Sequence, residues 1–141
     1  MSKDIKAAAE RLIAREKTAY LGSLDADGFP SIKAMMAPRK RVGVNVFYFS
    51  TNTSSQHVAQ FRADGRACLY FSNTLFVKGV LLKGRAEILD DPVSRELVWK
   101  QGDEKYYKLG LTDPDFCVIR FTTESLRYYS NMHSEDAPVV E

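Results

Sequence analysis

A run of hydroxyl and amide side chains follows an apolar segment near the middle of the sequence. In FYFSTNTSSQHVAQF, residues 47–61, the polar residues directly after the apolar run are Ser50, Thr51, Asn52, Thr53 and Ser54. We expect a strand to end here and a helix over residues 55–63 to begin. The free N–H groups and the dipole at a helix N-terminus attract anions, and hydroxyl groups add neutral donors. One interpretation of the run is therefore a cradle for a phosphate group.

A helix cap explains the same stretch. Thr53 and Gln56 have the spacing of a capping box, in which each side chain bonds the backbone N–H of the other residue. His57 falls in the first turn of the expected helix, where the dipole disfavours a protonated imidazole unless an anion is bound. The stretch by itself leaves both interpretations open.

A lysine and two methionines form a second candidate group. Lys33 interrupts an apolar segment and is followed by Ala34, Met35 and Met36. A lysine in such a pattern commonly faces solvent on the wet side of a strand. Polarisable methionines suit a flat ring system, however, and a lysine beside them is able to bind a phosphate or a ring carbonyl.

The elements that must position these residues are mainly strands. Residues 5–13 carry apolar side chains at helical spacing and predict an amphipathic helix of about three turns. TAYLGSL and FPSIKAMMA flank Asp25–Gly28, whose Asp-Gly pair predicts a tight hairpin turn. Further strands are predicted at VNVFYFS, RACLYFS and FVKGVLLKGRAEIL, the last bending at Gly79 and Gly84.

The second half of the chain adds two helices and more strands. Asp91-Pro92 predicts the start of a helix that ends near Gly102, and a short helix is predicted over residues 103–109. FCVIRFTTESLRYYS predicts two strands, and residues 132–141 predict a loose polar tail. About six strands with antiparallel hairpins favour one mainly β (α+β) domain over residues 1–131. A small barrel with peripheral helices satisfies this order, because closing the sheet removes its exposed edges.

Composition excludes several functional classes. Twenty basic and 18 acidic residues give a net charge of +2, too balanced to favour a nucleic-acid-binding surface. The cluster Pro38–Arg41 predicts a solvated loop, with a polyanion contact as the alternative. No stretch is apolar for long enough to span a membrane, and the N-terminal segment is unlike a signal peptide. Cys68 and Cys117 lack metal or redox spacing, so we expect reduced core thiols, no metal site and a cytoplasmic location.

Four segments taken together resemble a known family. They are YLGSLDADGFPSIKAMM, VFYFSTNTSSQHVAQFRADGRACLYF, VKGVLLKGRAEILDDP and VIRFTTESLRYYSN. Over residues 8–131 the chain resembles the pyridoxamine 5′-phosphate oxidase-like family of FMN-binding split barrels, and most of all its short general-stress-protein branch. The resemblance implies a six-stranded antiparallel split β-barrel that forms a homodimer, with two FMN sites in the clefts between subunits. Vitamin B6 synthesis is not expected, because the chain ends in an acidic tail instead of the basic residues that hold the phosphorylated vitamin.

The resemblance also implies which residues hold the cofactor. Lys33 is expected to reach the flavin phosphate or ring, and Ala34–Met36 to line the isoalloxazine. Ser50 and Thr51 correspond to flavin contacts at a strand end. Tyr129 corresponds to a late aromatic residue that closes over the cofactor.

The phosphate-binding turn is the place where this chain departs from the family. Ser55, Gln56 and His57 match this turn, and the family commonly carries a basic pair where Gln56-His57 stands. We expect the phosphate to raise the pKa of His57, and FMN to bind more tightly at lower pH. Lys78 and Gly79 match residues that reach the cofactor from the partner subunit.

The expected function is that of an FMN-binding oxidoreductase that passes electrons from a nicotinamide or other donor to a small acceptor. No acid–base residue identifies itself, so the catalytic residues stay unassigned and a non-catalytic flavin-binding module is the alternative. A third hypothesis is another ligand in the same cleft, such as haem or a deazaflavin, for which His57 and His133 are the available imidazoles. Tyr106, Tyr107, Tyr128 and Tyr129 are compatible with a subunit interface or with caps on the core.

Overall fold

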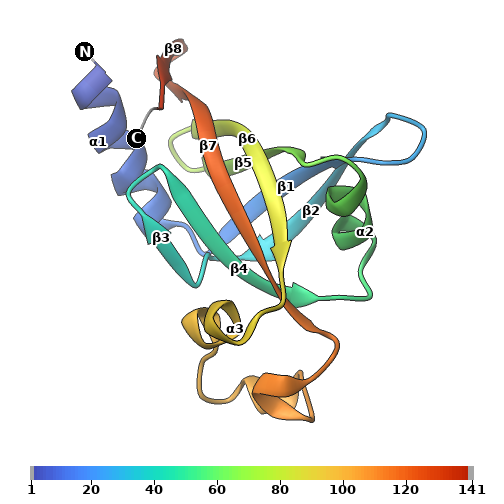
Figure 1. Cartoon of the computed structure of the whole chain (residues 1–141). Helices are drawn as coiled ribbons and strands as arrows, with labels where there is room; N and C mark the ends of the chain where they lie inside the picture. The colour runs from blue at the N-terminus through green and yellow to red at the C-terminus, as the bar shows by residue number, and fades with distance from the viewer. Residues whose placement is uncertain (1, 140–141) are drawn as a thin grey trace.

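A computed structural model describes residues 2–139 (Figure 1). Its helices are α1 (Ser2–Arg15), α2 (Gln56–Ala63) and α3 (Pro92–Val98), followed by the short 3-10 turns η1 (Asp103–Lys105) and η2 (Gly110–Thr112). The strands are β1 (Thr18–Leu24), β2 (Pro30–Met36), β3 (Lys40–Val42), β4 (Val46–Asn52), β5 (Arg66–Asn73), β6 (Lys78–Leu89), β7 (Phe116–Ser130) and β8 (His133–Pro138). In this part of the chain, no helix is long and apolar enough to cross a membrane.

The strands form one antiparallel sheet that curls into a barrel with one side open. Their order is β2-β1-β5-β6-β7-β4-β3, and β8 pairs with β7 off this path. At one end of the sheet β2 pairs only with β1, and at the other end β3 covers only Val46–Tyr48 of β4. The edges of β2 and of the second half of β4 therefore stay unpaired, and they border the opening. This arrangement confirms the mainly β split-barrel class.

Eight strands are present within residues 2–139 where about six were predicted. The first addition is β3, which begins within the basic cluster that was predicted to be a loop. Its three residues pair with β4, although Lys40 and Val42 are exposed and no apolar pattern marks the segment. Hydrogen bonding to the backbone of β4 decides the extended conformation of β3. Strand propensities of single residues do not report such pairing.

The second addition is β8, which corrects the predicted loose tail and the domain boundary at residue 131. It pairs with β7 from Ser125↔Pro138 to Ser130↔His133. Arg127 and Asp136 join the two strands through hydrogen bonds of 2.8 and 3.0 Å, and Ala137 is buried in the core. The segment was missed because five of its six residues are polar, charged or proline, and its buried face within β8 consists of one alanine.

Strand β7 is one continuous strand of 15 residues, although two strands were predicted over the same residues. It pairs with β4 through its first half, with β6 along most of its length and with β8 at its end. The register with β6 shifts between Lys83 and Gly84, one of the two glycines at which a bend was predicted. A Cβ atom at Gly84 would overlap the carbonyl oxygen of Thr122, so only glycine fits this bulge.

The predicted hairpin at Asp25–Gly28 is confirmed between β1 and β2. The Asp25 carboxylate accepts hydrogen bonds of 2.9 Å from the backbone N–H groups of Asp27 and Phe29. Gly28 has a φ of 84°, in the left-handed region that glycine adopts without strain. The turn fixes the register of β2 against β1, and with it the position of Lys33.

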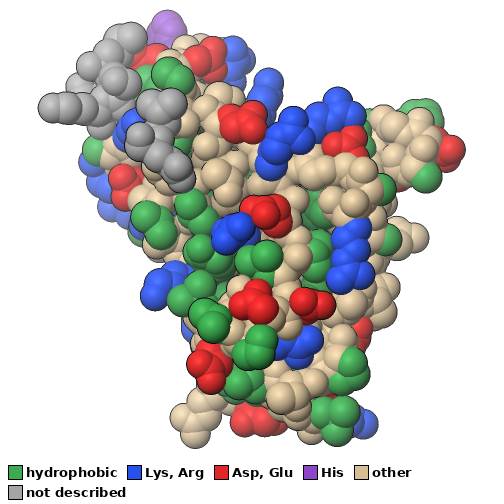
Figure 2. All heavy atoms as spheres, in the orientation of Figure 1, with side chains coloured by type: hydrophobic (Ala, Val, Ile, Leu, Met, Phe, Trp, Pro, Cys, Tyr) green, Lys and Arg blue, Asp and Glu red, His purple; other side chains and the backbone are tan. Residues whose placement is uncertain are grey.

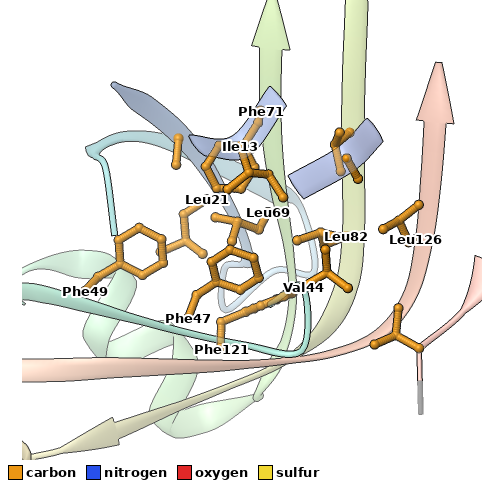
Figure 3. Packing of buried hydrophobic residues seen from close by; sticks show 14 of the residues in the cluster. Ile13, Leu21, Val44, Phe47, Phe49, Leu69, Phe71, Leu82, Phe121 and Leu126 are labelled. Atoms are coloured by element: carbon orange, nitrogen blue, oxygen red, sulfur yellow. The ribbon is translucent and has the colours of Figure 1, made fainter. Parts of the chain in front are cut away.

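The core fills the inside of the barrel and the space beneath α1 (Figure 3). Phe47 of β4 packs near Leu69, Phe71 and Phe121, Phe49 lies beside Leu21 of β1, and Ile13 of α1 belongs to the same cluster. The predicted amphipathic helix is therefore confirmed, and its apolar face packs against the barrel core. On the face shown in Figure 2, Lys and Arg side chains are interspersed with Asp and Glu, so this face has no dominant charge.

Candidate functional site

A cavity of about 210 Å³ lies at the opening of the barrel, between β2 and β4. Its walls contain six of the twelve residues predicted to bind a cofactor: Lys33, Ala34, Met35, Met36, Ser50 and Thr51. The remaining lining residues are Ala37, Arg39, Phe49, Asn52, Tyr106 and Tyr107. Lys33 of β2 and Ser50 of β4, which are 17 positions apart in the sequence, thus line the same cavity.

Strand β2 presents alternate residues to the inside and outside of the barrel. Lys33 lies opposite Leu21, and Met35 lies opposite Ala19, so both share the face of the core. Met35 is buried, whereas Lys33 is exposed because it lies at the open edge. Met36 projects from the outer face and is 67% exposed. The two methionines therefore meet the cavity from opposite faces of the strand.

Lys33 supplies the free positive charge of the cavity. The other cation in its wall is Arg39, whose guanidinium donates to both carboxylate oxygens of Asp103 at 2.8 and 3.1 Å. Among the described residues Lys33 makes no ion pair. Within the part of the chain that the structure describes, no acidic side chain lines the cavity. An anionic group is the ligand chemistry that this charge distribution favours.

The basic cluster at residues 38–41 is not the solvated loop that was predicted. The side chains of Arg39 and Asp103 are 11% and 6% exposed. Arg41 donates to the carbonyl oxygen of Gly43 at 3.0 Å and lies 3.4 Å from a carboxylate oxygen of Glu10. The sequence did not indicate the main pairing, since Arg39 and its acidic partner are 64 positions apart.

His57 lies behind the wall of the cavity and is 5% exposed. Its Nε2 atom is 2.9 Å from Oγ1 of Thr51 and 3.3 Å from Oγ of Ser55. Burial and then the positive charge of Lys33 lower the pKa of His57 from 6.5 to about 4. The imidazole is therefore neutral near pH 7. It contacts two hydroxyl groups and adds no charge to the site at this pH.

The capping box predicted at Thr53 is also wrong. The N-cap of α2 is Ser55, whose side chain makes no capping hydrogen bond. The Oγ of Ser55 donates instead to the carbonyl oxygen of Asn52 at 2.8 Å. Within the described residues, the buried Oγ1 of Thr53 has no hydrogen-bond partner. The hydroxyl run therefore does not serve as a conventional cap.

Asp115, which the sequence did not single out, holds the polar run in place. Its carboxylate accepts hydrogen bonds of 2.9 Å from the Asn52 side chain and from the backbone N–H of Ser54. Its backbone carbonyl accepts from the N–H of Thr53 at 2.8 Å. These bonds lower the pKa of the Asp115 carboxyl and keep it charged. A phosphate cannot use these two N–H groups.

The remaining predicted residues do not meet at this cavity within one chain. Gln56 is exposed on α2, and Ser55 is half-buried beside His57. Gly79 and Tyr129 are directly paired partners on β6 and β7, and Lys78 is the adjacent residue of β6. None of these five residues lines the cavity. Among the described residues, no group of three or more His, Cys, Asp or Glu side chains could hold a metal.

Tyr106 and Tyr107 reach the cavity from the segment between α3 and β7. Tyr107 is buried, and its ring lies 4.9 Å from that of Phe116, centroid to centroid. Burial raises the pKa of the Tyr107 phenol to about 12. The sequence marked both tyrosines only as aromatics for an interface or a core cap, because nothing in their spacing relates them to β2 or β4.

Comparison with known proteins places this geometry in a family. Residues 5–130 match the family model described as pyridoxamine 5′-phosphate oxidase. A protein from Clostridium acetobutylicum, described as related to general stress protein 26 of B. subtilis (pyridoxinephosphate oxidase family), is 34% identical. That match covers 99% of this chain and 97% of the other, with a TM-score of 0.89. No curated protein matches the sequence significantly.

More distant solved structures share the fold. General stress protein 26 from Bacillus anthracis str. Sterne is 18% identical over 95% of this chain and 98% of its own, with a TM-score of 0.77. A heme binding protein from Mycobacterium smegmatis is 18% identical over 94% of this chain and 57% of its own, with a TM-score of 0.70. The family model spans most of the chain, and the 34% identical relative spans nearly all of it. The chain therefore belongs to the pyridoxamine 5′-phosphate oxidase family.

Proposed function

We propose that the chain binds FMN at the cavity between β2 and β4 and acts as a flavin-dependent oxidoreductase. The observation that carries the proposal is the unpaired charge of Lys33 in a cavity whose other lining side chains are apolar or neutral polar, apart from Arg39, which is paired with Asp103. Such a site suits a ligand with one anionic end and a flat, mostly apolar body. The family membership supports the same choice of ligand.

The residues of the cavity fit the two parts of this ligand. Lys33 binds the phosphate through a charge-assisted contact, and the hydroxyl groups of Ser50 and Thr51 add neutral hydrogen bonds. Met35 and Ala34 lie against the ring system. His57 fixes the Thr51 hydroxyl from behind. When bound, the flavin supplies the transfer of electrons between a nicotinamide or other donor and an acceptor, and the protein supplies binding and orientation.

The size of the cavity supports a homodimer. Its volume of about 210 Å³ is below the range of roughly 300–1,000 Å³ that is usual for ligand sites. One chain therefore covers part of an FMN molecule, and a second copy completes the enclosure. Lys78, Gly79 and Tyr129, which lie outside the cavity of their own chain, are the residues that we assign to the partner's site.

An apolar outer surface continues from the cavity and gives the second copy a place to bind. Tyr20 and Tyr70 are paired on the outer face of β1 and β5, and Ile32 and Met36 lie on the same face of β2. Ile32 is 74% exposed and Met36 67%. Burial of these side chains in a symmetric contact would stabilise the dimer while closing the cavity. The two free cysteines, Cys68 and Cys117, agree with a reducing compartment, and we propose the cytoplasm.

A flavin-binding module without turnover is the second candidate. The groups beside the cavity with shifted pKa values titrate far from neutrality, His57 at about 4 and Tyr107 at about 12. Neither is suited to proton transfer near pH 7. Haem is less favoured, although one structural relative is a heme binding protein. The buried His57 already uses Nε2 in hydrogen bonds, and His133 lies away on β8.

The absorbance spectrum of the purified protein tests the proposal. Bound FMN gives a yellow protein with a band at about 450 nm, whereas haem gives an intense Soret band at shorter wavelength. Bleaching of the flavin band by NADH or NADPH, followed by its return with an acceptor, supports the oxidoreductase. A flavin that no donor reduces supports the module. A colourless protein that cannot be loaded with FMN contradicts both.

A further inference from the structure

One wall of the cavity comes from a segment that the barrel does not need for closure. Residues 90–115 leave β6, form α3, η1 and η2, and return as β7 below the barrel (Figure 1). Most of this excursion packs on a second, smaller core that includes Val98, Tyr107 and Phe116. Tyr106 differs from its buried neighbour: it is 58% exposed and still lines the cavity. An exposed aromatic ring at a ligand cavity is available for contact with the ligand.

Asp103 fixes both tyrosines. Its backbone carbonyl accepts hydrogen bonds from the N–H groups of Tyr106 at 2.9 Å and Tyr107 at 3.0 Å. Its carboxylate accepts the two bonds from Arg39 and a third from the N–H of Lys100 at 3.0 Å. Burial by itself would raise the pKa of the Asp103 carboxyl, but these bonds lower it and keep the carboxylate charged.

Arg39 connects this wall to the opposite one. It comes shortly after Met36 and Ala37, which line the cavity from β2 and the residue after it. Its backbone N–H donates to the carbonyl oxygen of Tyr48 of β4 at 2.8 Å. Its guanidinium also donates to the carbonyl oxygen of Val98 at 3.0 Å, at the end of α3. A planar guanidinium with bonds to Asp103 and Val98 holds the excursion at a defined distance from β2 and β4.

We infer that Tyr106 contacts the ring system of the bound ligand and selects for planar ligands, and that Arg39 and Asp103 are positioning residues for it. The inference rests on the proposed FMN site and adds a residue to it. Lys33 binds the anionic end from β2, and the ring of Tyr106 covers the flat body from the excursion. Lys105, whose Nζ lies 5.2 Å from the Tyr106 ring centroid, helps to hold the exposed ring in place.

Titration with FMN and with riboflavin tests the contact. Tyr106→Ala should weaken binding of both flavins by about 5–50-fold, since stacking on an aromatic side chain is lost. Tyr106→Phe should bind within about threefold of the native protein, because the ring remains. Leu109→Ala is the matched control, since Leu109 is 69% exposed on the same excursion but does not line the cavity. It should bind both flavins like the native protein.

Emission of the bound flavin gives a readout that a purely structural change would not produce. An excited flavin takes an electron from a tyrosine in contact with it, which quenches emission, whereas phenylalanine is too hard to oxidise. Bound FMN should therefore emit more strongly in Tyr106→Phe than in the native protein at similar affinity. Equal affinity in Tyr106→Ala together with unchanged emission in Tyr106→Phe would overturn the inference and leave the FMN site standing. Native protein that binds no FMN would overturn the proposed function, and this inference with it.

A double-mutant cycle tests the positioning role. Arg39→Lys keeps a positive charge but loses the two-pronged contact with Asp103, so it should weaken flavin binding in the native background. In the Tyr106→Ala background the same change should weaken binding no further, because its effect passes through Tyr106. Thermal melting and circular dichroism confirm that each variant is folded before titration. Additive losses in the double variant would show that Arg39 acts independently of Tyr106.

Discussion

The Nε2 atom of His57 lies 2.9 Å from Oγ1 of Thr51, so the imidazole lies one layer behind the cavity. This relationship changes the meaning of the strand–helix turn. The turn has a neutral, buried histidine where the resemblance implies a basic residue in the family. In the proposed site, binding of an anion depends on Lys33, with hydroxyl groups in a secondary role.

Removal of the Lys33 charge should weaken FMN binding. A charge-assisted contact contributes about 1.5–3 kcal/mol, so Lys33→Met should raise the Kd roughly 10–100-fold by equilibrium titration. Riboflavin, which lacks the phosphate, should lose much less. Lys40→Met is the matched control, because Lys40 is an exposed lysine of β3 outside the cavity. An equal loss in both lysine variants would remove Lys33 from the phosphate site.

The affinity for FMN should fall as the pH is lowered from about 8 to about 5.5. The phosphate monoester loses its second charge near pH 6, which weakens its contact with Lys33, while His57 remains neutral in this range. This direction is opposite to the one expected from the sequence. Tighter binding at lower pH would mean that His57 becomes protonated beside the phosphate despite its burial.

His57 should make the free energy of unfolding depend on pH. The unfolded chain binds a proton at this residue near pH 6.5, whereas the folded protein does so at about pH 4. The stabilising contribution is therefore complete above pH 6.5 and is lost as the pH falls toward 4, by up to about 3 kcal/mol. Urea titrations of His57→Gln should show a flatter profile than the native protein in this window. His133→Gln, a change at an exposed histidine of β8, should leave the native slope unchanged.

The buried ion pair should matter far more for stability than an exposed one. Arg39→Met leaves the Asp103 carboxylate buried without its main partner, and we expect a loss of about 3–5 kcal/mol in the free energy of unfolding. Arg85→Met breaks the exposed pair with Glu124 and should cost at most about 1 kcal/mol. Equal losses from the two variants in denaturant titrations would contradict the structural role of Arg39.

The C-terminal strand should be part of the cooperative unit. Ala137 is 4% exposed, so Ala137→Asp places a charge against the core and should destabilise the protein by about 2–5 kcal/mol. Ser134→Asp adds the same charge at an exposed position of the same strand and should cost little. A melting temperature that is the same in both variants would support the loose tail predicted from the sequence.

Local patterns predicted the parts of this fold that depend on neighbours in the sequence. The amphipathic pattern of residues 5–13 predicted α1, and Asp27-Gly28 predicted the turn that sets Lys33 in register. The strand boundaries around the hydroxyl run were close to those observed for β4 and α2. The prediction of two strands over β7 failed because no local signal says whether a long extended segment continues across a curved sheet.

The sequence by itself determined the class of the protein and half of its candidate site. The order of its predicted strands favoured a small antiparallel barrel, and the candidate residues Lys33–Met36 and Ser50-Thr51 line one cavity. Only the tertiary structure decided which groups carry charge there. Burial makes His57 neutral, Asp115 accepts hydrogen bonds from the N–H groups of Thr53 and Ser54, and Asp103 pairs with Arg39, 64 positions away in the sequence. Such effects depend on desolvation and on long-range contacts, which arise when the strands close around the core.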